Sequence, residues 1–164
     1  MISLSSQPTD KCHYIPHNNY RFDEAFFSNE LLNKVTVLLH AGAFIPKVSS
    51  DANHLALTES NITNTRRLVE GLKNLNKMVF LSTVDVYGDD EVITESTQEQ
   101  PVSMYGWSKL YCEKMLDAWA KENEVVLQLL RVGHVYGPGE EAYAKLIPIV
   151  INRILEGKEL AQYG

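Results

Sequence analysis

Three short apolar runs constrain the fold of this chain more than any other feature of its sequence. They are Lys34 to His40 (KVTVLLH), Lys77 to Ser82 (KMVFLS) and Glu124 to Arg131 (EVVLQLLR). Each run is apolar along its length and rich in β-branched or aliphatic residues, which is typical of a strand buried on both faces of a sheet. Segments with helical periodicity separate the runs. This alternation predicts an α/β fold with a parallel sheet and helices on both faces.

Three helices are expected, over residues 51–73, 104–122 and 146–155. The second follows Ser103, a residue type that commonly caps helix N-termini, and the third ends before Gly157, a plausible C-terminal cap. The first third of the chain is less regular. Its pattern indicates short strands at 2–6 and 13–16, followed by a short helix within 23–33.

Composition and charge limit the classes of partner. The 164 residues are 45% hydrophobic and 22% charged, with a formal net charge of -6. Nucleic acids and anionic membranes are bound by clustered Lys and Arg, which this sequence lacks, so small molecules are the expected partners.

Cys12 and Cys112 are far apart and outside any CxxC motif, which predicts neither a disulfide nor a metal site and favours a reducing cytoplasm. No apolar run is long enough to cross a bilayer.

The strongest local motif is YGWSK, residues 105–109, at the start of the second expected helix. Tyr105 and Lys109 are about one helical turn apart and therefore share a face. A nearby ammonium group favours the phenolate and lowers the pKa of a tyrosine from its usual value of about 10. The pairing predicts that Tyr105 accepts or donates a proton. Taken alone, the motif is more often structural, with the tyrosine only starting a helix and the lysine only pointing into solvent.

Two hydroxyl residues, Ser82 and Thr83, stand at the end of the second apolar run. Parallel sheets bind ligands at the carboxyl ends of their strands, so a hydroxyl here is expected to hydrogen-bond a substrate oxygen. The alternative is that both hydroxyls only satisfy backbone groups at the strand end.

Together these segments resemble the extended short-chain dehydrogenase/reductases, and within them the NAD-dependent epimerase/dehydratase family. The family's catalytic set is a Ser or Thr after a strand, followed by YxxxK. It corresponds here to Thr83, Tyr105 and Lys109, with Ser82 as the neighbouring alternative. The resemblance extends over roughly residues 34–160. It implies a Rossmann-like, doubly wound parallel sheet.

The resemblance also implies a cofactor, NAD or NADP, and a substrate. Residues 40–43 (HAGA) are similar to the family segment that lines the adenosine and pyrophosphate side of the cofactor. Asn61 matches a family asparagine that supports the active-site backbone. Residues 131–139 (RVGHVYGPG) are similar to the stretch near the nicotinamide and the substrate. The implied cofactor-binding residues are His40, Ala41, Gly42, Ala43, Leu81, Ser82, Tyr105, Lys109 and Val132, and the implied substrate-binding residues are Thr83, Val84 and His134.

The sequence departs from the family pattern in three places. None of its nine glycines has GxxGxxG spacing, so the family's first strand and glycine-rich loop are expected to be missing and the 164 residues alone to be inactive. The strand at 2–6 ends in SSQ, without the acidic residue or arginine that would favour NAD or NADP. His134 stands where sugar-nucleotide epimerases usually carry an asparagine. This weakens the assignment of a nucleotide-sugar substrate.

The activity implied by the resemblance is NAD(P)-dependent epimerisation or dehydration of a nucleotide sugar through hydride transfer. Two alternatives remain, an NADP-dependent carbonyl reductase on the same scaffold and a non-catalytic dinucleotide-binding regulatory module. The complete set of Thr83, Tyr105 and Lys109 argues against the second.

We expect a partial catalytic domain over residues 1–140 and the beginning of a substrate-binding region over 141–164. The family often dimerises through the helices expected here at 51–73 and 104–122, and their outward faces are expected to be polar, with Arg66, Arg67, Glu113 and Asp117.

Overall fold

The computed structural model describes residues 1–5, 10–17, 20–45, 54–88, 92–137 and 146–159. It divides into two compact units, Met1–Val132 and Gly133–Gly164. The elements of the first unit, in chain order, are β1 (Ile2–Ser5), β2 (His13–Pro16), α1 (Glu24–Phe27), η1 (Leu32–Lys34), β3 (Val37–His40), α2 (His54–Leu57), η3 (Thr58–Thr63), α3 (Asn64–Gly71), β4 (Lys77–Thr83), η4 (Val84–Val86), α4 (Met104–Glu122) and β5 (Val126–Val132). The second unit contains α5 (Leu146–Leu155).

All strand pairing in the described residues is parallel. β1 pairs with β2, and β3, β4 and β5 form a separate three-stranded sheet in that order. The predicted parallel α/β fold is therefore confirmed. The strands nevertheless form two sheets rather than one, because no hydrogen-bonded ladder joins β1 or β2 to β3 within the described ranges.

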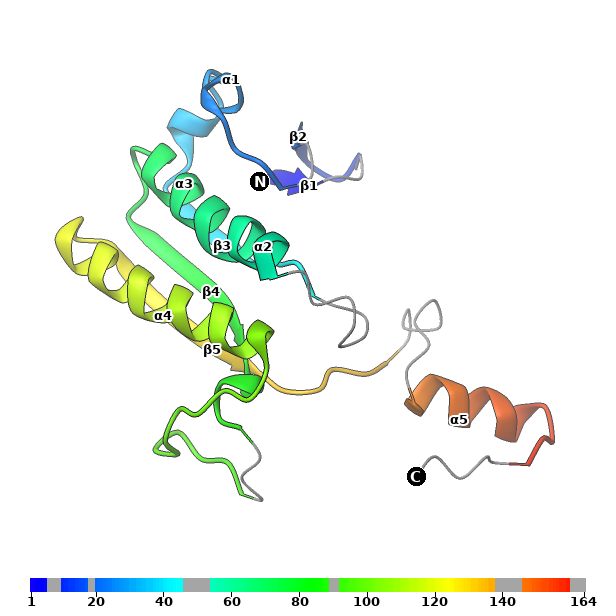
Figure 1. The fold of residues 1–164 in the computed structure, drawn as a ribbon. Coiled ribbons are helices and arrows are strands. Elements are labelled where there is room, and N and C mark those ends of the chain that lie inside the picture. Colours follow the sequence, from blue (N-terminus) through cyan, green and yellow to red (C-terminus); the bar gives the residue numbers. More distant parts are fainter. Residues whose placement is uncertain (6–9, 18–19, 46–53, 89–91, 138–145, 160–164) are drawn as a thin grey trace. The chain divides into compact units, whose positions relative to one another are not determined.

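The core of the first unit lies between the three-stranded sheet and the helices α3 and α4, which run in front of the strands in Figure 1. β4 contributes Met78 and Phe80, which are 0% and 1% exposed, and α4 contributes Leu116. Alternate residues of β3 face the other way and remain exposed, with Val37 at 57% and Leu39 at 64%. The helices of the described residues thus cover the face to which Leu38 and Phe80 belong.

The expected helix over 51–73 is present from residue 54, but it is not a uniform α-helix. Its central turn, η3, is a π-helix between α2 and α3. A π segment widens the helix and is often found at functional sites. The start of the expected helix at 51–53 lies outside the described residues.

α4 spans the residues predicted for it, and Ser103 is its N-cap, with its hydroxyl accepting from Gly106 N at 2.9 Å. This bond satisfies one of the backbone N–H groups that a helix start leaves unpaired. The predicted helix within 23–33 is two short turns, α1 and η1, and Asp23 caps the first of them. All three strands β3, β4 and β5 lie within one to three residues of their expected bounds.

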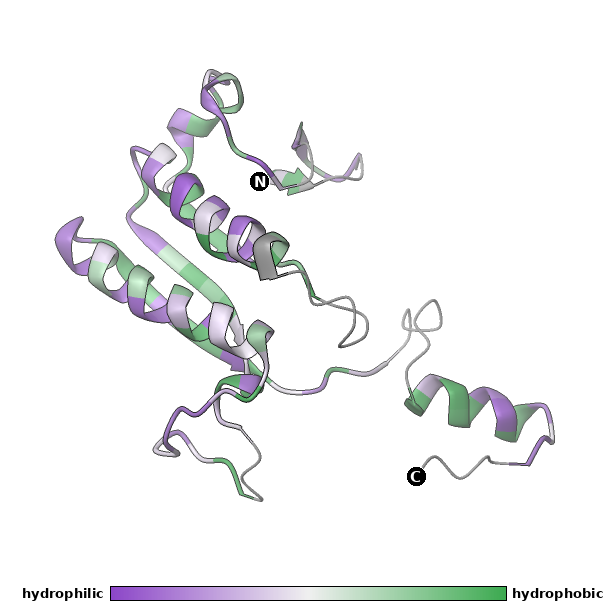
Figure 2. Cartoon of the chain, viewed as in Figure 1, coloured by the Kyte–Doolittle hydropathy of each residue, from purple (hydrophilic) through white to green (hydrophobic). Residues whose placement is uncertain are grey.

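In the second unit, α5 ends before Gly157, whose φ of +64° is the left-handed conformation that glycine adopts readily. Figure 2 shows that α5 is predominantly hydrophobic, and none of its residues is buried within its own unit. The expected domain boundary near residue 140 falls in 138–145, which lies outside the described residues.

Candidate active site

The carboxyl ends of β3, β4 and β5 meet at one edge of the sheet. The parallel register pairs His40 with Phe80 and Thr83 with Val132. Most of the predicted site residues lie at this edge, which is where parallel sheets bind ligands. Ala41 and Gly42 follow β3 and are exposed, while Val84 follows β4. His134 belongs to the second unit, where it is exposed.

Lys109 points from α4 to the end of β4. Its Nζ donates to the Leu81 carbonyl oxygen at 2.5 Å and lies 4.0 Å from the centre of the Phe80 ring. The residue is only 2% exposed. Burial lowers the pKa of Lys109 to about 8, an effect partly offset by Cys112 and Glu113. An amine held in this way is still mostly protonated at neutral pH and close to the strand residues that precede Thr83.

Gly106 allows the first turn of α4 to approach the chain that follows Thr83. A Cβ atom at residue 106 would lie 2.5 Å from the Asp85 carbonyl oxygen, closer than side-chain carbons pack. Tyr105 therefore lies in the first turn of a helix that packs closely against η4. Thr83 caps η4, since its Oγ1 accepts from Asp85 N at 3.2 Å. The segment after β4, which carries Thr83, thus lies against α4, which carries Tyr105 and Lys109.

The pKa of Tyr105 is shifted in the opposite direction from the one expected from the neighbouring Lys109. Burial, and secondly the Asp85 carboxylate, raise the pKa of Tyr105 to about 12. The expected lowering by Lys109 is absent because that ammonium group is directed to Leu81 and Phe80 instead. At neutral pH the phenol of this structure is protonated and is a proton donor.

The two candidate hydroxyls have different surroundings. Successive residues of a strand face opposite sides, so Ser82 lies on the face of Phe80 and Thr83 on the other. The Ser82 hydroxyl is buried and has no hydrogen-bond partner among the described residues. The Thr83 hydroxyl already accepts the cap bond from Asp85 N but has a donor hydrogen left to offer.

His40 turns into the core instead of toward the edge. Its Nε2 contacts the Tyr20 hydroxyl at 2.5 Å and Thr65 Oγ1 at 3.2 Å. Burial, and secondly the charge of Lys109, lower the pKa of His40 to about 3, so the imidazole is neutral at physiological pH. The imidazole is therefore packed as a core group, and only the backbone after it is exposed for a ligand.

Tyr20 is a residue that the sequence analysis missed. Its ring packs against Gly42, where a Cβ atom would lie 2.6 Å from Tyr20 Cε2. Tyr20 also has a positive φ of 59°, an uncommon conformation for a residue other than glycine. The preceding segment has weak periodicity, so no sequence pattern connected this tyrosine with residue 42.

Asn61 joins two parts of the site. Its Oδ1 accepts from Phe44 N at 2.7 Å, and its Nδ2 donates to the Phe44 carbonyl and to Ser108 Oγ. The residue therefore holds the segment after β3 against α4, in agreement with the supporting role expected for it. Asn61 belongs to the π-helical turn, and its carbonyl accepts from the Cys112 thiol at 2.9 Å. Burial raises the pKa of Cys112 to about 12, so the thiol remains a donor.

The described part of the chain contains no cluster of His, Cys, Asp or Glu that could hold a metal ion. Both cysteines are free. No described helix is long and apolar enough to span a membrane.

Comparison with known proteins gives one consistent family. The model of the NAD dependent epimerase/dehydratase family matches residues 10–164. The dTDP-D-glucose 4,6-dehydratase of Dictyostelium discoideum is 28% identical over 146 residues, which cover 80% of this chain and 33% of that protein.

Two solved structures show the same fold. The UDP-glucuronic acid 4-epimerase of Bacillus cereus in complex with NAD superposes with a TM-score of 0.73 at 27% identity, over 93% of this chain and 48% of that one. The UDP-glucose 4-epimerase of Thermotoga maritima with UDP-glucose gives a TM-score of 0.83 at 23% identity, over 99% of this chain and 57% of that one. The chain thus spans between a third and somewhat more than half of the length of these proteins.

Proposed function

Since the chain belongs to the NAD dependent epimerase/dehydratase family, we propose that it forms part of an enzyme that epimerises or dehydrates a nucleotide sugar with NAD. The observation that carries this proposal is the placement of Tyr105 and Lys109 on one turn of α4, with Lys109 bonded to the end of β4 two residues before Thr83. The similar proteins named above include a dehydratase and two epimerases, so both reactions are proposed.

The described residues fit one side of a dinucleotide. Ala41 and Gly42 are small and exposed just after β3, so a ligand can approach their backbone closely. Lys109 supplies a buried ammonium group near the nicotinamide ribose expected at the end of β4. Bound NAD would supply the acceptor, and later the donor, of a hydride at the reacting sugar carbon.

In the proposed reaction, Tyr105 as the phenolate would accept the proton of the sugar hydroxyl, while the carbon that bears this hydroxyl gives up a hydride to the bound NAD and becomes a carbonyl. Thr83 donates a hydrogen bond to the same oxygen and fixes its position. Because the pKa of Tyr105 is raised to about 12, the phenol must lose its proton before it serves as a base. We propose that oxidation therefore becomes faster as the pH rises above neutral, whereas return of the proton is favoured at lower pH.

The proposal is tested with the intact protein, NAD or NADP, and a panel of UDP- and dTDP-sugars, with simple ketones as controls. Interconversion of two sugar epimers, or formation of a 4-keto-6-deoxy sugar, supports it. Reduction of simple ketones with NADPH, without turnover of any nucleotide sugar, would assign the protein instead to the carbonyl reductases.

We also propose that the 164 residues alone bind NAD weakly. The pyrophosphate of a dinucleotide is held by the N–H groups of a glycine-rich loop at a helix N-terminus, and no GxxGxxG spacing occurs among the nine glycines of this sequence. Calorimetric titration of this chain is expected to give a Kd in the millimolar range, about −4 kcal/mol. Micromolar binding would contradict the expectation.

We further propose that the intact protein is a homodimer that buries the outer face of α4. The prediction that Glu113 lies on the outward face of α4 is wrong, because Glu113 points inward and is 1% exposed. Outward-facing Met104, Trp107 and Tyr111 are instead 45%, 52% and 57% exposed. Such an apolar stripe is typical of an association surface. Tyr111 also lines a shallow groove, together with Arg66, Val69, Glu70, Met115, Ala118, Trp119 and Glu122.

Light scattering of the Tyr111→Glu variant tests the dimer. The new charge at the stripe is expected to halve the molar mass in solution, since burying an unpaired carboxylate is costly. Gln98→Glu, which adds the same charge at an exposed loop residue, is the matched control and should remain dimeric. A wild-type protein of monomer mass would contradict the proposal.

A further inference from the structure

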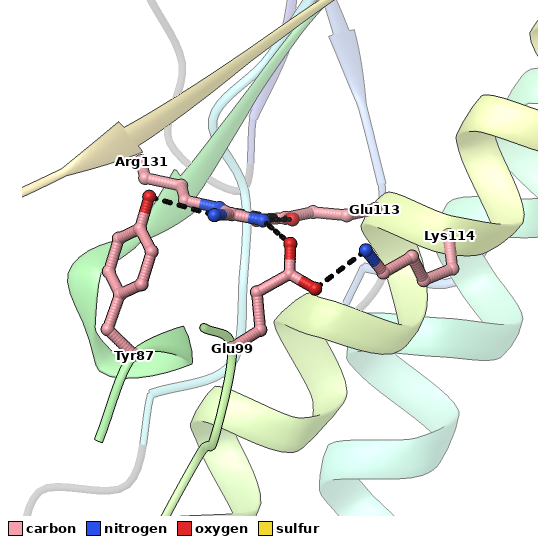
Figure 3. A network of polar contacts seen from close by, with 5 residues as sticks. All are labelled: Tyr87, Glu99, Glu113, Lys114 and Arg131. Atoms are coloured by element: carbon pink, nitrogen blue, oxygen red, sulfur yellow. Dashed lines mark hydrogen bonds and ion pairs between the residues drawn. The ribbon is translucent and has the colours of Figure 1, made fainter. Parts of the chain in front are cut away.

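A network of charged and polar side chains lies beside the candidate site, and its centre is Arg131 of β5 (Figure 3). The guanidinium group bonds to both Glu113 oxygens, with Nη2 at 2.7 Å from Oε2 and Nε at 3.1 Å from Oε1. Nη1 donates to the Tyr87 hydroxyl at 2.8 Å, and Nη2 also pairs with Glu99. The group lies 4.7 Å from the centre of the Tyr87 ring. One side chain therefore joins three others.

The three partners come from three parts of the chain, which are the segment after β4, the loop before α4, and α4 itself, which carries both Tyr105 and Lys109. Tyr87 directly follows η4 and is four residues after Thr83. Glu99 lies in the loop before α4, six residues before Tyr105, and Glu113 is one helical turn after Lys109. Figure 3 shows these partners converging on the guanidinium group.

The contacts of Arg131 are largely shielded from water. The side chain of Arg131 is 19% exposed, and that of Glu113 is 1% exposed. Breaking a buried pair by removing one partner is strongly destabilising, because the remaining charge is left without a counter-charge. The planar guanidinium also directs its donors along several fixed directions, which the single ammonium of a lysine does not reproduce.

In residues 92–103, the described part of the loop before α4, few other contacts reach the rest of the chain. Val92 and Ile93, near its beginning, are 76% and 41% exposed. The Gln100 N–H donates to the Val86 carbonyl at 2.9 Å, which ties the same loop end to the segment after Thr83. Lys114 reaches Glu99 from the outside at 2.7 Å, but its own side chain is 63% exposed. Of the two ion pairs of Glu99, the one with Arg131 is therefore the better shielded, because the Arg131 side chain is 19% exposed.

We propose that Arg131 is a positioning residue that holds the segment after Thr83 and the loop before α4 against α4, which bears Tyr105 and Lys109. It acts through Tyr87, Glu99 and Glu113, and it does not touch the substrate. The assignment rests on the proposed function for the identity of the catalytic residues. The fastening of the three segments is a property of the fold and is measurable without any activity.

Amide hydrogen exchange of the 164-residue chain, followed by mass spectrometry, tests the fastening. Glu99→Met removes the ion pair with Arg131, and Tyr87→Phe removes the hydrogen bond to it. Arg131→Lys keeps the positive charge but loses the several directed N–H donors of the guanidinium group. Each variant is expected to speed exchange in residues 84–88 and 97–103 about tenfold, through local opening, while exchange in β3 and α3 changes less than about twofold.

Lys114→Met is the matched control, because it removes the exposed contact to Glu99 and leaves Arg131 bonded. It should change exchange in 84–88 and 97–103 by less than about twofold. The proposal is overturned if Glu99→Met and Tyr87→Phe behave like Lys114→Met, or if exchange rises equally in every element. If Arg131→Lys fails to fold, the other two variants still decide the outcome.

Kinetics of the intact protein separate positioning from general stability. Arg131→Lys is expected to lower kcat about a hundredfold while KM changes less than about threefold, because misplaced catalytic groups affect the reacting geometry more than binding. A change confined to KM would overturn the proposal. An intact wild type that turns over no nucleotide sugar would instead refute the proposed function, and the exchange experiment would still decide on Arg131.

Discussion

Replacement of Tyr105 by phenylalanine in the intact protein is expected to lower kcat about a thousandfold, because the variant keeps the ring but has no proton to exchange with the substrate. The fold should survive, since the rest of α4 is anchored by Leu110, Cys112 and Leu116 in the core. The measurement is turnover of the nucleotide sugar, with the unfolding temperature recorded on the same preparation.

Tyr111→Phe is the matched control for this experiment. Tyr111 lies on the same helix, and phenylalanine keeps its apolar ring at the proposed dimer surface, so loss of the hydroxyl should leave kcat within about twofold of the wild type. Near-normal turnover in Tyr105→Phe, with the control behaving as expected, would remove Tyr105 from the mechanism.

Gly106→Ala is expected to reduce both stability and activity, although alanine normally favours a helix by about 1 kcal/mol over glycine. The added Cβ atom would lie 2.5 Å from the Asp85 carbonyl oxygen and 3.1 Å from Pro101 Cβ, so α4 or η4 must shift. Overpacking of this kind costs about 1–3 kcal/mol. Displacement of the helix start by about 1 Å should also lower kcat about a hundredfold.

Urea unfolding and steady-state kinetics of Gly106→Ala test this expectation. Lys121→Ala near the exposed end of α4 is a suitable control, since its only described ion pair is with Asp117 at the surface, which typically contributes less than about 1 kcal/mol. A Gly106→Ala protein more stable than the wild type, and equally active, would show that the close approach of α4 to η4 is unimportant.

The fold followed from local patterns in the sequence. Continuous apolar runs placed β3, β4 and β5, and Ser103 placed the start of α4. The π-helical turn η3 was not predicted, because apolar periodicity does not report one additional residue in a turn. The separation of β1 and β2 from the other strands was also not predicted, since strand pairing depends on contacts that are distant in sequence.

The sequence offers candidate site residues but does not reveal their electrostatics. Helical spacing predicts that Tyr105 and Lys109 share one helix face. The pKa of Tyr105 depends on burial and on Asp85, which spacing does not reveal. Glu113 was assigned to an outward face, although it is buried against Arg131. A helix with apolar residues on more than one side gives no clear indication of which side a charged residue occupies.

The π-helical turn has a practical consequence for chemical modification of the chain. Its Asn61 carbonyl accepts from Cys112, which is 0% exposed and whose pKa is raised to about 12 by burial. Thiolate is the form that reacts with alkylating reagents, so this sulfur is protected both by lack of access and by protonation. Cys12 is partly exposed. The folded chain should therefore accept a maleimide dye at one position, which provides a specific attachment point for fluorescence measurements near the N-terminus.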